Sequence, residues 1–243
     1  MKVKVVNNNF KPVFASLVGN IMEWYDFALY GYFATIISTL FFPTHSEVAS
    51  LTLTFAVFAS GFFIRPLGGY LFGRIGDKYG RKKTLVASIG LVTISTLCIG
   101  LMPGYEAIGI FAPILLTMMR LLQGMAVSGE LISAGVFLTE IAPPNRKGFF
   151  GSLAMCSIYI GLLIGSLFCY LISSTFDDEQ LISFGWRIPF LFSAAFGLFS
   201  LKLRINCDES PEFTAHLKRN QTNYKNESVT DTAFWKKVAQ ATT

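Results

Sequence analysis

Six long apolar runs follow one another along the chain, and this feature restricts its fold more than any other. A helix that crosses a bilayer needs about 20 mostly apolar residues, and each run is close to that length or longer. The chain is therefore predicted to be an all-α membrane protein with six transmembrane helices. The predicted spans cover residues 13–41, 48–72, 84–102, 108–138, 149–173 and 186–203.

Composition excludes the other broad classes of protein. Hydrophobic residues make up 52% of the 243 residues and charged residues only 14%, whereas an ordinary soluble domain carries about 25% charged residues. The same hydrophobic content excludes a disordered chain. The net charge of +5 does not indicate nucleic-acid binding, because the basic residues stand at the ends of apolar runs and no soluble fold presents them.

The connections between the runs differ in charge. Basic residues precede the first run, follow the second, fourth and sixth runs, and are missing from the connections at 42–47, 103–106 and 175–185. Because cytoplasmic connections carry the excess of Lys and Arg, both termini are predicted to be cytoplasmic. An even number of spans requires the same result. We expect a multi-pass protein of the cell (inner) membrane.

Two regions are expected along the chain. Residues 1–205 form the six-helix transmembrane bundle, and the polar residues 206–243 form a cytoplasmic tail. The order of three spans, a junction and three spans also allows a three-plus-three inverted repeat, although repeats of this kind leave weak traces in sequence.

Five ionisable residues lie inside the predicted spans. A charge at the centre of a bilayer costs roughly 2.5–3.5 kcal/mol on insertion scales, so it persists only beside a partner or in a water-filled cavity. Three acids and two bases nearly cancel if they share one central cavity. These residues are Glu23, Asp26, Arg65, Arg120 and Glu130.

A polar stripe runs along the first predicted span. Asn20, Glu23, Asp26 and Tyr30 are separated by three, three and four residues, and this spacing places them on one face of a helix. We interpret the stripe as the wall of a cavity in which Glu23 or Asp26 takes up a proton. The alternative is a structural ion pair with one of the two intramembrane arginines.

The fourth predicted span carries a second polar stripe, with Arg120, Gln123 and Glu130 on it. Arg120 is permanently charged, which makes it a natural partner for a substrate carboxylate or for Asp26. Glu130 lies either in the cavity or at its cytoplasmic rim. In the second span, Arg65 either joins the cavity or extends its side chain to the membrane surface.

The junction GRIGDKYGRKK at 73–83 is the most specific string in the chain. Gly73 and Gly80 allow tight turns. Asp77 can cap a helix end or pair with Arg81 or Arg146. A connection without further function needs only positive charge, so this order of glycine, acid and base predicts a latch that holds one conformation of a gate.

These strings resemble the major facilitator superfamily, and in finer detail its metabolite:proton symporter branch, which includes carriers of proline and betaine, α-ketoglutarate, citrate and shikimate. The strings are GNIMEWYDFALYGYFA at 19–34, RPLGGYLFGRIGDKYGRKKTL at 65–85, RLLQGMAVSGE at 120–130, WRIPFL at 186–191 and ESPEF at 209–213. The resemblance implies alternating access and proton-driven uptake of a small polar metabolite such as an organic acid, proline or betaine. It also implies a cytoplasmic gate formed by Gly73, Asp77, Gly80, Arg81, Glu140 and Arg146.

The family has twelve helices, and the resemblance here covers residues 10–213, the N-terminal six-helix half. The expected partners are the lipid bilayer, the solute and a proton. The rival hypothesis is a truncated, non-transporting half-carrier, or one that needs a second six-helix half or a second copy of itself. An intramembrane enzyme is not expected, because His45 and His216 lie outside the spans and no catalytic motif is present. No cofactor or metal site is expected.

Overall fold

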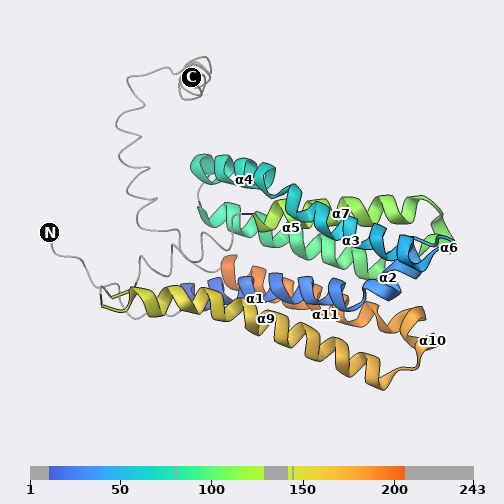
Figure 1. Ribbon diagram of the computed structural model, residues 1–243. Coiled ribbons are helices and arrows are strands. Elements are labelled where there is room, and N and C mark those ends of the chain that lie inside the picture. Colours follow the sequence, from blue (N-terminus) through green and yellow to red (C-terminus); the bar gives the residue numbers. More distant parts are fainter. Residues whose placement is uncertain (1–10, 80, 129–141, 144, 206–243) are drawn as a thin grey trace, which may run out of the picture. The chain divides into compact units, whose positions relative to one another are not determined.

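The computed structural model describes residues 11–79, 81–128, 142–143 and 145–205, and the elements within these ranges are all helical (Figure 1). The first predicted span is formed by two helices, the second by two, and each of the others by one main helix. The elements are α1 (Lys11–Tyr32), α2 (Ala34–Phe41), α3 (Glu47–Phe63), α4 (Arg65–Tyr79), α5 (Arg81–Leu101), α6 (Tyr105–Ile108), α7 (Phe111–Val127), α9 (Lys147–Thr175), α10 (Asp178–Gln180), the π-helical turn η1 (Leu181–Gly185) and α11 (Arg187–Ile205).

Four of the described helical stretches are long and apolar enough to cross a membrane. They are Glu47–Gly76, Lys83–Leu101, Lys147–Thr175 and Asp178–Ile205. Helix α7 is apolar but shorter, and its predicted span continues past the described residues. The first span differs from these four because it carries two acids near its middle and is interrupted at Phe33, between α1 and α2.

The second span bends at Ile64, between α3 and α4. Pro66 is the second residue of α4. Because proline has no backbone N–H and its ring clashes with the carbonyl four residues earlier, a bend is expected here. The helix resumes at once, since the Gly68 amide donates to the Ile64 carbonyl at 3.1 Å. Arg65 therefore stands at the bend, inside the apolar part of the span.

Two connections have clear local causes. Ser46 caps α3, because its hydroxyl accepts a hydrogen bond from the Ala49 amide at 3.4 Å, and Glu47 adds a negative charge to the first turn. Between α6 and α7, Gly109 has φ of +57°, a left-handed conformation that glycine adopts without steric cost.

The helices pack with a three-plus-three pattern (Figure 1). Helix α1 packs against α9 and α11, while α7 packs against α3, α4 and α5, and α5 packs against α11. If the first, second and third spans are exchanged with the fourth, fifth and sixth, each of these pairs of neighbouring spans becomes another pair in the same set. This is the packing expected of two related three-helix units, in agreement with the predicted fold class.

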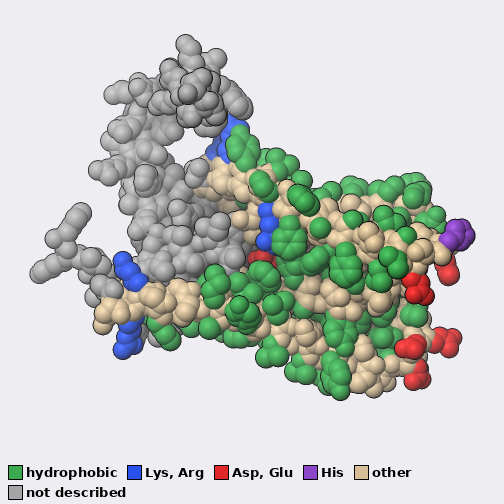
Figure 2. Space-filling model, viewed as in Figure 1, with side chains coloured by type: hydrophobic (Ala, Val, Ile, Leu, Met, Phe, Trp, Pro, Cys, Tyr) green, Lys and Arg blue, Asp and Glu red, His purple; other side chains and the backbone are tan. Residues whose placement is uncertain are grey.

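The outer surface of the bundle is apolar on its long sides. Large hydrophobic side chains such as Phe63, Phe111, Tyr159 and Leu163 are exposed, as expected of helices that face lipid. Figure 2 shows acidic side chains at the end of the bundle that carries α6 and α10, and lysine and arginine side chains toward the other end. The surface therefore has an apolar band between two ends of opposite charge.

Candidate functional site

A buried polar layer divides the interior of the bundle. Four helices contribute to it: Asp26 comes from α1, Thr96 from α5, Arg120 and Gln123 from α7, and Ser193 from α11. A hydrophobic cluster lies on either side of this layer. One cluster includes Leu29, Ile99, Leu116 and Phe190, and the other includes Met22, Phe72, Val92 and Val127.

Hydrogen bonds join these side chains into a continuous network. Arg120 Nη1 donates to Gln123 Oε1 at 3.0 Å, and Gln123 Nε2 donates to Thr96 Oγ1 at 2.8 Å. Thr96 in turn donates to Asp26 Oδ2 at 2.8 Å. Ser193 donates to the other carboxylate oxygen, Asp26 Oδ1. Asp26 and Arg120 are thus linked through two neutral side chains and not by a direct ion pair.

Arg120 is buried and only partly hydrogen-bonded. Its guanidinium lies 3.7 Å from the ring centroid of Tyr30, close enough for a cation–π interaction. The Tyr30 hydroxyl is fixed by donating to the Thr54 carbonyl at 3.1 Å. Arg120 Nε and Nη2 have no hydrogen-bond partner among the described residues. A buried cation with unused donors is suited to binding an anion.

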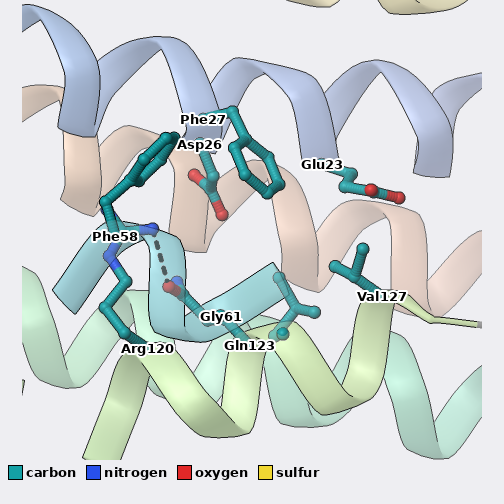
Figure 3. Close-up of a pocket in the computed structure, with 10 residues that line it drawn as sticks. Glu23, Asp26, Phe27, Phe58, Gly61, Arg120, Gln123 and Val127 are labelled. Atoms are coloured by element: carbon teal, nitrogen blue, oxygen red, sulfur yellow. Dashed lines mark hydrogen bonds between the residues drawn. The ribbon is translucent and has the colours of Figure 1, made fainter. Parts of the chain in front are cut away.

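A small pocket lies beside this network and is lined in part by it (Figure 3). Its volume is about 20 Å³, enough for about one water molecule. In Figure 3 the Asp26 carboxylate points toward Arg120 and Gln123, whereas the Glu23 carboxylate points away from Asp26. The lining residues are Glu23, Asp26, Phe27, Phe58, Gly61, Val92, Arg120, Gln123, Gly124 and Val127.

A second charged pair lies one helical turn from Asp26. Glu23 Oε1 is 3.8 Å from Arg65 Nη2, which joins α1 to the bend of the second span. The Arg65 guanidinium also stacks on Phe62 and Phe27, at 4.4 Å and 5.2 Å from their ring centroids. The two acids of the predicted stripe therefore have different partners.

The structure brings together most of the predicted cavity residues. Glu23, Asp26, Arg120 and Gln123 line one pocket, and Tyr30 stacks against Arg120. Arg65 reaches the same region through Glu23. Their roles in binding and proton transfer remain predictions.

Asn20 departs from the predicted cavity wall. Its side-chain amide donates to the Ala154 carbonyl at 3.0 Å and to Ser157 Oγ at 2.6 Å, both on α9. Asn20 therefore holds α1 against α9 and is not among the pocket-lining residues. The polar stripe of α1 therefore has two parts, one that lines the cavity and one that contacts α9. The spacing of polar residues in the sequence does not distinguish them.

The described part of the chain shows only some of the predicted gate. Gly73 lies on α4, and beyond its own stretch of helix no heavy atom of the described residues lies within 4 Å of the position a Cβ would occupy. Arg146 is exposed immediately before α9. Asp77 and Arg81 lie in α4 and α5, but their side chains are not described. Gly80, Glu140 and the predicted cavity residue Glu130 fall outside the described residues.

Several residues of the site were not predicted from the sequence. Thr96 and Ser193 bind Asp26 across separations of 70 and 167 residues, and each resembles any small polar residue in an apolar helix. Phe27 and Phe58 line the pocket, but their positions in apolar runs indicate only contact with lipid or with neighbouring helices. The repeated spacing of polar residues was the one available signal, and it was confined to α1 and α7.

The chemistry that the site offers is binding and proton exchange. Asp26 is a carboxylate that can accept a proton, and Arg120 supplies donors for an anion. Among the described residues, no group of three or more His, Cys, Asp or Glu is placed to hold a metal ion.

Comparison with known proteins identifies the family. Residues 12–237 match the family model described as sugar (and other) transporter. The glycine betaine/proline/ectoine/pipecolic acid transporter OusA of Dickeya dadantii is 40% identical over 213 residues, covering 88% of this chain and 42% of that protein. The proline/betaine transporter of Salmonella typhimurium is 41% identical over 209 residues (86% and 42%), and a putative proline/betaine transporter of Staphylococcus aureus is 44% identical over 204 residues (84% and 44%). The chain thus spans less than half the length of these relatives.

Solved structures show the same fold. The proton:xylose symporter XylE of the major facilitator superfamily, bound to 6-bromo-6-deoxy-D-glucose, matches with a TM-score of 0.74 at 22% identity, over 84% of this chain and 46% of that one. A partially occluded inward-open form of XylE from E. coli matches equally well, with a TM-score of 0.74 over 85% and 51% of the two chains. The family consists of membrane transporters and not enzymes, which confirms the predicted class. With a fold that matches one half of XylE, this chain belongs to the sugar (and other) transporter family of the major facilitator superfamily.

Proposed function

We propose that the chain carries out proton-coupled symport of a small carboxylate-bearing solute across the cell (inner) membrane by alternating access. The observation that carries this proposal is the buried network joining Asp26 to Arg120 through Thr96 and Gln123. Charged groups inside a membrane are costly and mark proton relays and solute pathways. Coupling requires a proton site and a solute site whose states affect each other, and this network links such a pair.

The two charged ends of the network take different roles. Arg120 binds the solute carboxylate through Nε and Nη2, which have no hydrogen-bond partner in the described part of the chain. Asp26 binds the proton, because the groups that hydrogen-bond its carboxylate in the described part of the chain are two hydroxyl groups, which it can exchange. Glu23 faces the cation Arg65 instead, so we assign that pair to holding α1 against the bend of the second span.

The chemical groups of this site suit a small zwitterion such as proline or glycine betaine. Several relatives bear the name of proline/betaine transporters. Aromatic faces bind quaternary and secondary ammonium groups, and Phe27, Phe58 and Tyr30 lie within the same site as Arg120. The carboxylate would meet Arg120 while the ammonium group meets these rings.

The proposed orientation places both termini in the cytoplasm. The connections at the end with α6 and α10 contain Glu106, Asp177, Asp178 and Glu179 and no Lys or Arg, while the basic connections lie at the other end. A membrane potential of 100 mV, inside negative, supplies about 2.3 kcal/mol per proton carried inward. That is enough for an accumulation of about fiftyfold.

Uptake into proteoliposomes tests the proposal. With an inward proton gradient, the chain is expected to accumulate radiolabelled glycine betaine or proline, and a collapsed gradient is expected to stop accumulation. The variants Asp26→Asn and Glu23→Gln/Asp26→Asn are expected to lose gradient-driven accumulation. Glu106→Gln, which alters an acid in an outer connection, is the matched control and is expected to behave like the unaltered chain. Accumulation by the double variant would overturn the proton role.

A half-carrier that works only with a second six-helix half is the alternative. It is favoured by the pocket, whose volume of about 20 Å³ holds a water molecule but not proline. On this hypothesis, uptake appears only when the chain is reconstituted together with the C-terminal six-helix half of the Salmonella typhimurium relative. Uptake by the chain alone would reject it.

A further inference from the structure

The hydrogen bonds between Arg120 and Asp26 all run in one direction. Arginine only donates, and an ionised carboxylate only accepts. Gln123 must therefore turn its carbonyl toward Arg120 and its amide nitrogen toward Thr96, and Thr96 must donate to Asp26. The amide orientation of Gln123 is thus fixed by the two charged ends of the network.

We propose that Thr96 and Gln123 form a directional relay by which a proton on Asp26 releases Arg120 for solute binding. The inference rests on the proposed function, because it requires Asp26 to be the proton site. It gives Thr96 and Gln123 positioning roles, since each acts on the solute only through Arg120.

The relay works by reversing its hydrogen bonds. A hydronium ion from the aqueous phase gives a proton to Asp26 Oδ2: one O–H bond of the hydronium breaks and leaves a neutral water molecule, and one O–H bond forms on Oδ2. This oxygen then donates to Thr96. The Thr96 hydroxyl hydrogen rotates toward Gln123, and no further bond to hydrogen forms or breaks. Gln123 must now present its carbonyl to Thr96, which leaves its NH₂ group facing Arg120. Two donors cannot hydrogen-bond to each other, so Arg120 loses its protein acceptor and offers Nη1 together with Nε and Nη2.

The geometry favours Oδ2 as the oxygen that binds the proton. Oδ2 belongs to the branch that leads through Thr96 to Gln123, which lines the pocket, whereas Oδ1 accepts from Ser193, which does not. Helices α5 and α11 face Asp26 with the hydroxyl groups of Thr96 and Ser193. Among the described residues, the charged and titratable groups around it are Glu23, Tyr25 and Tyr30 on α1, Arg120 on α7 and Arg65 on α4, with Cys169 of α9 beside Tyr25.

Infrared difference spectroscopy on the purified full chain tests the relay without any ligand. Spectra at acid and alkaline pH report the carboxyl band of Asp26, assigned by its loss in Asp26→Asn, and the side-chain amide band of Gln123, assigned by its loss in Gln123→Leu. Acidification is expected to move the Gln123 band, because its carbonyl exchanges a guanidinium partner for a hydroxyl group.

Three variants separate the relay from a general effect of the Asp26 proton. Thr96→Val keeps the shape of the side chain but removes the hydroxyl, so the Gln123 band is expected not to respond to pH. Thr96→Ser restores the hydroxyl and the response. Ser193→Ala is the matched control: it removes the other donor to Asp26 and is expected to keep the Gln123 response.

Binding of glycine betaine to the same variants gives an independent readout. In the unaltered chain and in Thr96→Ser, acidification is expected to tighten binding by a factor within the usual range of coupling between sites, about 5- to 150-fold. In Thr96→Val that factor is expected to fall to about one.

The possible results distinguish the relay through Thr96 and Gln123 from the proton site at Asp26. If the Asp26 band titrates but the Gln123 band does not move, or moves equally in Thr96→Val, the relay is wrong and the proton site stands. The relay is also wrong if the Gln123 band stops responding to pH in Ser193→Ala but still responds in Thr96→Val. If no Asp26 band titrates, the proposed proton site fails, and the relay fails with it.

Discussion

At the scale of single residues, the site depends on one guanidinium with a fixed orientation. Arg120 stacks on Tyr30 at 3.7 Å and donates to Gln123 at 3.0 Å, and these two contacts direct its remaining N–H groups. Lysine would keep the charge but not the planar set of donors. We therefore expect anion binding at this position to require the guanidinium group and not only a positive charge.

Arg120→Lys is expected to weaken glycine betaine binding by roughly 10- to 100-fold, because a hydrogen bond to a charged group contributes about 1.5–3 kcal/mol. Titration calorimetry measures this change. Arg187→Lys is the matched control, since Arg187 also stacks on an aromatic ring, Trp186 at 4.8 Å, but lies outside the pocket. Equal losses in both variants would contradict a specific role for Arg120.

Asn20 provides the opposite case, a predicted site residue that contacts another helix. Because hydrogen bonds between membrane helices contribute about 0.6 kcal/mol on average and up to about 1.7, Asn20→Leu is expected to lower the free energy of unfolding by about 1 kcal/mol. It should leave the pH dependence of glycine betaine binding unchanged. Ser157→Ala removes part of the same contact, so the two losses are expected not to add. If glycine betaine binding by Asn20→Leu no longer depended on pH, Asn20 would belong to the functional site after all.

At the scale of helices, the pocket depends on a close crossing of α3 and α7. A Cβ on Gly124 would overlap the carbonyl oxygen of Gly61. Glycine at this position lets the two backbones touch and holds Gln123 and Arg120 beside the pocket. The crossing therefore sets both the stability of this helix pair and the width of the site.

Gly124→Ala is expected to destabilise the protein by about 1–3 kcal/mol, the usual cost of overpacking. Thermal unfolding in detergent measures the loss. Gly90→Ala is the control, since Gly90 also lies in a helix, but no heavy atom of the described residues outside its own stretch of helix lies within 4 Å of its Cβ position. Unchanged stability in Gly124→Ala would mean that the crossing is looser than described.

The helices differ in how well their sequences predict them. Apolar length predicts the long helices, and Pro66 indicates a bend in the second span. The interruption between α1 and α2 at Phe33 was not predicted, because the first apolar run continues across this residue. On α1 and α7, polar residues at helical spacing predict the site. Thr96 and Ser193 could not be predicted, because a lone hydroxyl in an apolar helix becomes part of a site only through contacts with distant helices.

At the scale of the whole molecule, the bundle has an acidic end and a basic end around one buried polar layer. The sequence predicts this arrangement, because charge in the connections and apolar length in the spans are local properties. It does not predict the size of the pocket, which depends on how side chains from several helices fill the space.

The proposed orientation predicts which positions can be labelled from outside the cell. In a variant whose four cysteines are replaced by serine, Glu106→Cys is expected to react with a membrane-impermeant thiol reagent on intact cells. Lys147→Cys, at the basic end, is expected to react only after the membrane is opened. The reverse pattern would invert the proposed topology.

In the proposed mechanism, the binding of one proton to Asp26 and the binding of one solute molecule to Arg120 depend on each other. The most direct measurement is the proton movement that follows addition of glycine betaine to proteoliposomes in which uptake has been established, read with a pH-sensitive dye. The medium is expected to become alkaline as solute and protons enter the vesicles together, and Asp26→Asn is expected to abolish this change. An Asp26→Asn variant that moves as many protons per solute as the unaltered chain would contradict it.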